Sequence, residues 1–126
     1  MVLVDTSVWI EYFRGNEQVK NLNDLIDSNT LAINDLILTE LLPFIIQKKE
    51  NKLKKLLLNL DRIKMNIDWN GLIQMQTLNL QNGINKVGIP DLIIAQNAIQ
   101  TNLHLYSLDK HFKLMSSLFG LKLIHK

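Results

Sequence analysis

Four acidic residues of this 126-residue chain stand in apolar surroundings, where a carboxylate needs a partner or a function. Asp5 follows a short aliphatic run, and Glu40 interrupts the apolar stretch 36–46. Asp91 precedes another aliphatic run, and Asp109 comes shortly after a fourth apolar segment. An ionised carboxylate in a buried setting is costly unless it is paired or coordinates a cation. These four acids are therefore the first candidates for chemistry.

Each acid also has a purely structural explanation. Asp5, Asp91 and Asp109 all stand where a helix is expected to begin, and aspartate is a favoured N-cap residue. A buried salt bridge could explain Glu40, although the chain has only two arginines and neither lies in an apolar segment. A lysine could still reach Glu40 from the surface. Taken singly, none of the four acids decides between a structural and a functional role.

The hydrophobic pattern predicts short strands that alternate with helices. The expected strands cover residues 2–4, 31–33, 62–67, 103–106 and 121–124, and the expected helices cover 7–13, 17–27, 36–46, 48–60, 69–80, 89–101 and 109–117. Because no hairpin turn signals join the strands, right-handed crossovers and a mainly parallel sheet are expected. The prediction is a single domain over residues 1–126, a three-layer α/β/α sandwich with a five-stranded sheet. Pro43 is expected to kink its helix or to displace its start.

This architecture brings the four acids toward one edge of the sheet. Asp5 and Asp109 each follow a strand, Asp91 begins the helix that leads into the fourth strand, and Glu40 lies on the helix after the second strand. Open α/β sheets bind ligands at the carboxyl ends of their strands. Four carboxylates gathered there repel one another unless a cation compensates them, and hard oxygen ligands suit Mg²⁺ or Mn²⁺. Such a cation can activate water for attack on phosphorus, as in metal-dependent nucleases.

The composition is that of a globular protein and sets limits on other functions. The chain is 47% hydrophobic and 21% charged, and it contains no cysteine, which excludes disulfides and thiolate metal sites. Its three histidines, His104, His111 and His125, lack metal-ligand spacing and predict no alternative metal site. The first residues do not form a secretory signal, and no apolar run approaches the ~18 residues of a membrane span. A cytoplasmic location without membrane contact is expected.

The segments around the four acids resemble a PIN domain, and more specifically a VapC-type toxin of a toxin–antitoxin pair. The matching segments are Val2-Leu-Val-Asp-Thr-Ser-Val-Trp-Ile, Leu38-Thr-Glu-Leu-Leu, Gly88-Ile-Pro-Asp-Leu-Ile-Ile-Ala and Ser107-Leu-Asp-Lys-His-Phe. They cover the chain in the family's order. The sequence departs from the family at Leu42-Pro43-Phe44 and at Gln96 and Asn97, where small residues are usual.

The resemblance implies a Mg²⁺-dependent endoribonuclease, with Mn²⁺ as an alternative ion. Asp5, Glu40, Asp91 and Asp109 would be its catalytic, metal-binding acids, and a hydroxyl of Thr6 or Ser7 would support them. The implied partners are a cognate VapB-like antitoxin that blocks the acidic pocket, an RNA substrate such as transfer RNA, and a second copy of the chain in a homodimer.

A lysine-rich segment is the candidate surface for RNA. Lys48, Lys49, Lys52 and Lys55 alternate with leucines in a predicted amphipathic helix. The net charge of the whole chain is only +2, so affinity for nucleic acid must come from a local patch. The alternative is a solvated helix face with no ligand.

Other functional classes fit the sequence less well. A catalytically degenerate PIN domain that only binds protein or RNA is the main alternative, and the presence of all four acids disfavours it. A receiver-like module needs an acidic pair after its first strand, whereas here only Asp5 follows that strand. A dinucleotide-binding fold needs a glycine-rich first turn, which Asp5-Thr6-Ser7 does not provide.

Overall fold

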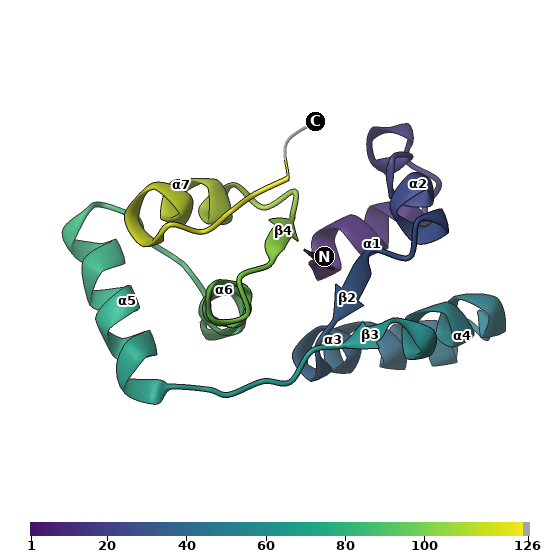
Figure 1. Cartoon of the computed structure of the whole chain (residues 1–126), viewed down its shortest axis with the longest axis horizontal. Coiled ribbons are helices and arrows are strands. Elements are labelled where there is room, and N and C mark those ends of the chain that lie inside the picture. Colours follow the sequence, from purple (N-terminus) through teal and green to yellow (C-terminus); the bar gives the residue numbers. More distant parts are fainter. Residues whose placement is uncertain (125–126) are drawn as a thin grey trace.

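The computed structural model describes residues 1–124 and contains a four-stranded sheet surrounded by helices (Figure 1). The elements are β1 (Val2–Val4), α1 (Thr6–Phe13), the 3₁₀ helix η1 (Glu17–Val19), α2 (Leu22–Asp27), β2 (Leu31–Ile33), α3 (Asp35–Gln47), α4 (Asn51–Asn59), β3 (Asp61–Arg62), α5 (Trp69–Gln81), α6 (Ile89–Gln100), β4 (His104–Tyr106) and α7 (Lys110–Phe119). The prediction for His125 falls outside the described residues.

All pairings in the sheet are parallel, and the strand order is β3-β2-β1-β4. The central strand β1 pairs with both β2 and β4, and every residue of β1 and β2 is buried. Strands that are covered on both faces are expected to read as short continuous apolar runs, as these two do. The sheet therefore directs the carboxyl ends of all four strands to one edge.

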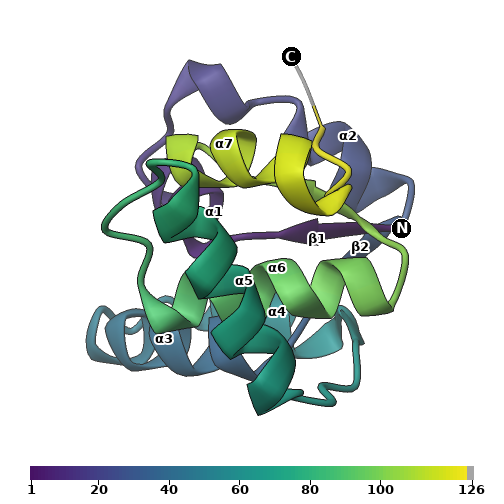
Figure 2. The ribbon, with the colours of Figure 1, turned by 90° about the vertical axis from the view of Figure 1, so that its left-hand side faces the viewer.

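Helices cover both faces of this sheet. In Figure 1, α1 and α2 lie on one side of the strands, whereas α6 and, outside it, α5 lie on the other. Figure 2 looks at the sheet through α5 and α6, with α7 above them and α3 and α4 below. This arrangement confirms the predicted α/β fold with a parallel sheet. Among the described residues, no helix is long and apolar enough to span a membrane.

The edges of the sheet differ from the prediction. The expected fifth strand, 121–124, makes only an isolated bridge between Leu123 and Leu105, because the chain contacts β4 around a single residue. The expected third strand, 62–67, is reduced to the two exposed residues of β3. Beyond Ile63, whose backbone N–H donates to the carbonyl of Ile33, the chain leaves the sheet toward α5. The sheet therefore has four strands and one bridge instead of five strands.

Three helices also differ from the prediction. Pro43 does not displace the start of its helix: α3 begins at Asp35 and continues past Pro43, which is exposed. The expected helix 17–27 is divided into η1 and α2. The expected helix 48–60 begins only at Asn51, because Lys49 adopts a left-handed conformation with φ of 57° and ends the preceding α3.

The two polar residues that depart from the family pattern are buried and have partners. Asn97 accepts a hydrogen bond from the Asn34 side chain at 2.9 Å and donates to the carbonyl of Lys64 at 3.2 Å. Gln96 both accepts from the backbone N–H of Asp68 and donates to its carbonyl. Buried amides with satisfied hydrogen bonds are compatible with a well-packed core. They tie α6 to α3 and to the loop before α5.

Candidate active site

Three helices begin at the edge where the acids gather. Asp5 is the N-cap of α1 and accepts from Ser7 N, and Asp109 is the N-cap of α7 and accepts from His111 N. Asp91 lies in the first turn of α6, whose N-cap is Gly88. The structural explanation is thus correct for Asp5 and Asp109, which do cap helices, but not for Asp91. A capping carboxylate still has lone pairs for a second ligand.

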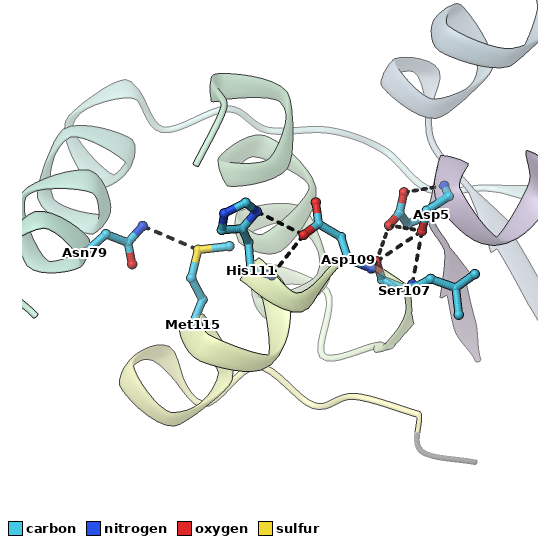
Figure 3. A network of polar contacts seen from close by, with 8 residues as sticks. Asp5, Asn79, Ser107, Asp109, His111 and Met115 are labelled. Atoms are coloured by element: carbon cyan, nitrogen blue, oxygen red, sulfur yellow. Dashed lines mark hydrogen bonds and ion pairs between the residues drawn. The ribbon is translucent and has the colours of Figure 1, made fainter. Parts of the chain in front are cut away.

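Asp5 is almost completely buried, with an exposed fraction of 5%, and is held by three donors. Its Oδ1 accepts from Ser7 N at 3.0 Å, and its Oδ2 accepts from Ser7 Oγ at 2.9 Å and from Ser107 Oγ (Figure 3). Both hydroxyls in turn accept backbone N–H groups of the β4–α7 loop, from Leu108 and Asp109. Burial raises the pKa of the Asp5 carboxyl, while these hydrogen bonds counteract the rise.

Glu40 lies at the same site but is exposed, so the expectation of a buried, costly carboxylate is wrong. The apolar side chains of α3 that are buried occupy one face of the helix, and Glu40 lies outside that face. Its Oε1 accepts a hydrogen bond from Thr6 Oγ1 at 2.8 Å. The structure thus gives each of the two predicted hydroxyls a carboxylate partner, Thr6 with Glu40 and Ser7 with Asp5.

The electrostatics of Asp91 show that the four acids interact. Burial first, and then the negative charges of Asp109, Asp5 and Glu40, raise the pKa of the Asp91 carboxyl to about 6, while His111 lowers it. Such couplings require the charged groups to be close together. These charge interactions agree with the prediction that the topology gathers the four acids at one edge of the sheet.

Two further residues of the site were not among the predicted ones. Ser107 donates to Asp5, and His111 lies in a cluster with Asp91 and Asp109 in which one ligand atom of each residue falls within 4.8 Å of the others. The prediction that the histidines form no alternative metal site did not anticipate that His111 lies beside two of the acids. It rested on spacing between histidines, whereas His111 stands two residues after an acid, in the first turn of the helix that this acid caps.

The donor set at this edge fits a hard divalent cation. Among the described residues, no lysine or arginine forms an ion pair with any of the four acids. No described residue donates a hydrogen bond to the Asp91 carboxylate, to Asp109 Oδ2 or to Glu40 Oε2. Carboxylate oxygens without a countercharge are the ligands preferred by Mg²⁺ and Mn²⁺.

The lysine-rich segment, residues 48–55, contains none of the four acids, and its lysines are mostly exposed. Lys48 and Lys49 follow the end of α3, and Lys52 and Lys55 lie on α4. Lys48 Nζ lies 5.7 Å from the centre of the Phe44 ring. None of these lysines forms an ion pair with a described residue, so their charges are available to a ligand or to solvent.

Comparison with protein families identifies the fold. Residues 2–118 match the PIN domain. The chain belongs to the PIN-domain family. Comparison with curated protein sequences gives no match.

Solved structures with the same fold cover nearly all of the chain. VapBC2 from Rickettsia felis, bound to a DNA fragment from its promoter, is 25% identical with a TM-score of 0.76, and 98% of each chain is covered. DNA-bound VapBC from Salmonella typhimurium is 17% identical with a TM-score of 0.75, covering 98% of this PIN domain and 96% of that chain. FitAcB from Neisseria gonorrhoeae is 19% identical with a TM-score of 0.71, and the match covers 99% of this chain and 97% of that chain. The likeness to VapBC2 supports a VapC-type PIN toxin, and the other two likenesses show the same fold.

The raised pKa of Asp91 predicts how the stability of the metal-free protein depends on pH. The carboxyl takes up its proton near pH 6 in the folded state and near its ordinary value of 3.8 in the unfolded state. The folded state therefore gains stability as the pH falls from 7 through 6 toward 4. Asp91→Asn should remove this gain and raise the free energy of unfolding at pH 7 by roughly 1–2 kcal/mol, after a discount for partial exposure.

Urea denaturation in EDTA at several pH values measures this effect. The exposed Asp24 on α2 provides the control, since Asp24→Asn removes one negative charge far from the cluster in sequence. Parallel pH profiles for the wild type and Asp91→Asn would contradict the electrostatic account of the site.

Proposed function

We propose that this PIN domain is a Mg²⁺-dependent endoribonuclease toxin that hydrolyses RNA phosphodiester bonds and is neutralised by a cognate VapB-like antitoxin. The observation that carries the proposal is the gathering of Asp5, Glu40, Asp91 and Asp109 without a lysine or arginine countercharge among the described residues. PIN domains are generally nucleases, and the 25% identical match comes from a VapBC complex.

Each acid would contribute differently to holding the cation, Mg²⁺ or Mn²⁺. Asp5 is fixed in orientation by Ser7 and Ser107 and keeps a lone pair on Oδ1. Asp91 and Asp109 would offer oxygens that have no protein donor, and Glu40 would approach from the exposed side. When bound, the cation would supply activation of water and stabilisation of the charge that develops at phosphorus.

The proposed RNA-binding surface is the lysine-rich segment. Phosphate contacts dominate the affinity of proteins for nucleic acids, and four exposed lysines follow one another over residues 48–55. A structured RNA such as transfer RNA would present several phosphates to such a surface. The location of toxin and RNA would be the cytoplasm.

The proposed antitoxin surface is a groove that reaches the acids. One cavity of about 250 Å³ is lined by residues of α1, α3 and α4 and of the segments that follow α1 and α3, among them Phe13 and Lys48. A second cavity of about 190 Å³ includes Glu40, and the two share Ile10, Arg14 and Phe44. An antitoxin segment that follows this apolar groove would arrive at the acidic site, where a basic side chain could neutralise it.

The proposed homodimer would use α5, which lies on the outside of the molecule in Figures 1 and 2. This helix contains no charged residue, and Trp69 and Ile73 are 61% and 64% exposed. A groove of about 360 Å³ extends along it to Ile89 of α6. An uncharged apolar face can meet its own copy across a two-fold axis without like-charge repulsion.

The second candidate function is a PIN domain that only binds its partners. It would be favoured if the acidic site bound a cation and antitoxin without cutting RNA.

Loss of a single acid is expected to abolish cleavage. Asp5→Asn or Asp91→Asn should reduce the cutting of a small-RNA pool in Mg²⁺ by about 100-fold or more, because each removes a charged ligand while keeping the shape of the side chain. Asp24→Asn serves as the control, and EDTA should stop the wild-type reaction. Equal cleavage by both site variants and the wild type would overturn the proposed function.

Reversal of two lysine charges tests the RNA surface. In an Asp5→Asn background that leaves RNA intact, Lys52→Glu with Lys55→Glu should weaken binding and lower the slope of log affinity against log salt by about one or more. Lys20→Glu with Lys122→Glu changes the net charge equally at other exposed positions. If both pairs of substitutions have the same effect, the lysine-rich segment is only a solvated surface.

A charge on α5 tests the homodimer. The wild type should have twice the 14.6 kDa mass of one chain by light scattering, and Ile73→Glu should shift it to the monomer, because a buried unpaired charge is costly. Leu114→Glu on α7 introduces the same charge at another exposed apolar position and should not do so. A dimer that survives Ile73→Glu would place the interface elsewhere.

A further inference from the structure

Two buried asparagines form a chain of hydrogen bonds that joins α3, α6 and the segment after β3. Oδ1 of Asn34 accepts the backbone N–H of Ile37 at 2.9 Å, and Nδ2 of Asn34 donates to Oδ1 of Asn97 at 2.9 Å. Nδ2 of Asn97 then donates to the carbonyl of Lys64 at 3.2 Å. Reversal of either amide would place two acceptors against each other, so the chain of hydrogen bonds has a single orientation.

The amide nitrogen of Asn34 is not needed for the cap of α3. Capping uses only the oxygen of this side chain, and serine is an equally favoured N-cap residue. Asn34 and Asn97 are only 0% and 2% exposed, so their polar groups depend on each other for hydrogen bonds. Among the described residues, no other side-chain hydrogen bond connects α3 or its cap to α6. The pair is therefore a specific link between these two helices.

Each asparagine stands six positions from one of the four acids. Asn34 precedes Glu40 at the start of α3, and Asn97 follows Asp91 toward the end of α6. Six residues of helix span about 9 Å on either side. Because the two spans are equal, helices that run in opposite directions from the asparagine contact place the two acids opposite each other as well.

The electrostatics of Asp91 agree with this arrangement. Burial first, and then the charges of the other three acids, Glu40 among them, raise the pKa of the Asp91 carboxyl. The charge of Glu40 can act on Asp91 only if α3 passes near the start of α6. In Figure 2, α3 lies below α6. One end of the contact between the helices thus holds the amide pair, and the other end holds the two carboxylates.

We infer that Asn34 and Asn97 are positioning residues of the proposed nuclease site, which fix α6 against α3 and thereby set the separation of Asp91 and Glu40. This inference rests on the proposed function. A ligand group must be held within about 0.5 Å of its working position, and rigid helices transmit a shift from one end to the other. The two asparagines act through the acids and need not touch the cation or the RNA.

Mn²⁺ affinity, measured by electron paramagnetic resonance without RNA, tests the inference. Asn34→Ser keeps a capping oxygen for α3 but removes the amide that donates to Asn97. It should bind Mn²⁺ about 5–10-fold more weakly than the wild type, a smaller loss than the 10–100-fold typical of direct partners of metal ligands. Asn97→Leu should have the same effect. The double variant should bind no more weakly than either single variant, because both substitutions break the same link.

A stability control separates positioning from a purely structural role. Val19→Ala removes buried apolar contacts in η1, which carries none of the four acids, and should lower the urea midpoint while Mn²⁺ affinity stays at the wild-type value. Asn34→Ser carries the test if Asn97→Leu does not fold. Wild-type affinity in Asn34→Ser, or losses that add in the double variant, would overturn the inference alone. A folded wild type that bound no Mn²⁺ would overturn the cation of the proposed function together with the inference.

Discussion

Electrostatic repulsion between carboxylates gathered at one edge of the sheet is the constraint on which the site depends. Three helices begin at this edge, and the partial positive charge of a helix N-terminus stabilises the acid beside it. The backbone donors of Ser7 and His111 add to this effect at Asp5 and Asp109. The stabilisation is incomplete, since burial and then the charges of the other three acids raise the pKa of Asp91 to about 6. The remaining negative charge is what a divalent cation would neutralise.

The short strands determine where this charge is concentrated. Asp5 follows the central strand β1, and its backbone N–H donates to the carbonyl of Tyr106 at the end of β4. The hydroxyls of Ser7 and Ser107 then join the start of α1 to the loop before α7. Because backbone and side-chain hydrogen bonds connect the same two segments, Asp5 is held at a fixed position relative to that loop. The buried sheet and the site are thus built from continuous stretches of chain.

The sequence was sufficient to predict the alternation of strands and helices and the grouping of the acids, because apolar runs and strand ends are local features. It was less informative where three-dimensional packing decides. Glu40 stands in an apolar stretch, but a helix has an outer face, and the sequence alone did not show that Glu40 lies on it. His111 belongs to the site because the cap of α7 brings its side chain back to Asp109. The edge segments after Ile63 and Gly120 have strand-like composition but lack a partner along most of their length.

The central claim is that the four acids form one cation site at the carboxyl ends of the strands. The most direct measurement is an anomalous difference map from crystals of the wild-type protein soaked in Mn²⁺. The account predicts a peak in contact with carboxylate oxygens of Asp5, Asp91 and Asp109. A map with no peak there, in crystals that bind Mn²⁺ at other acids such as Asp24 or Asp35, would contradict it.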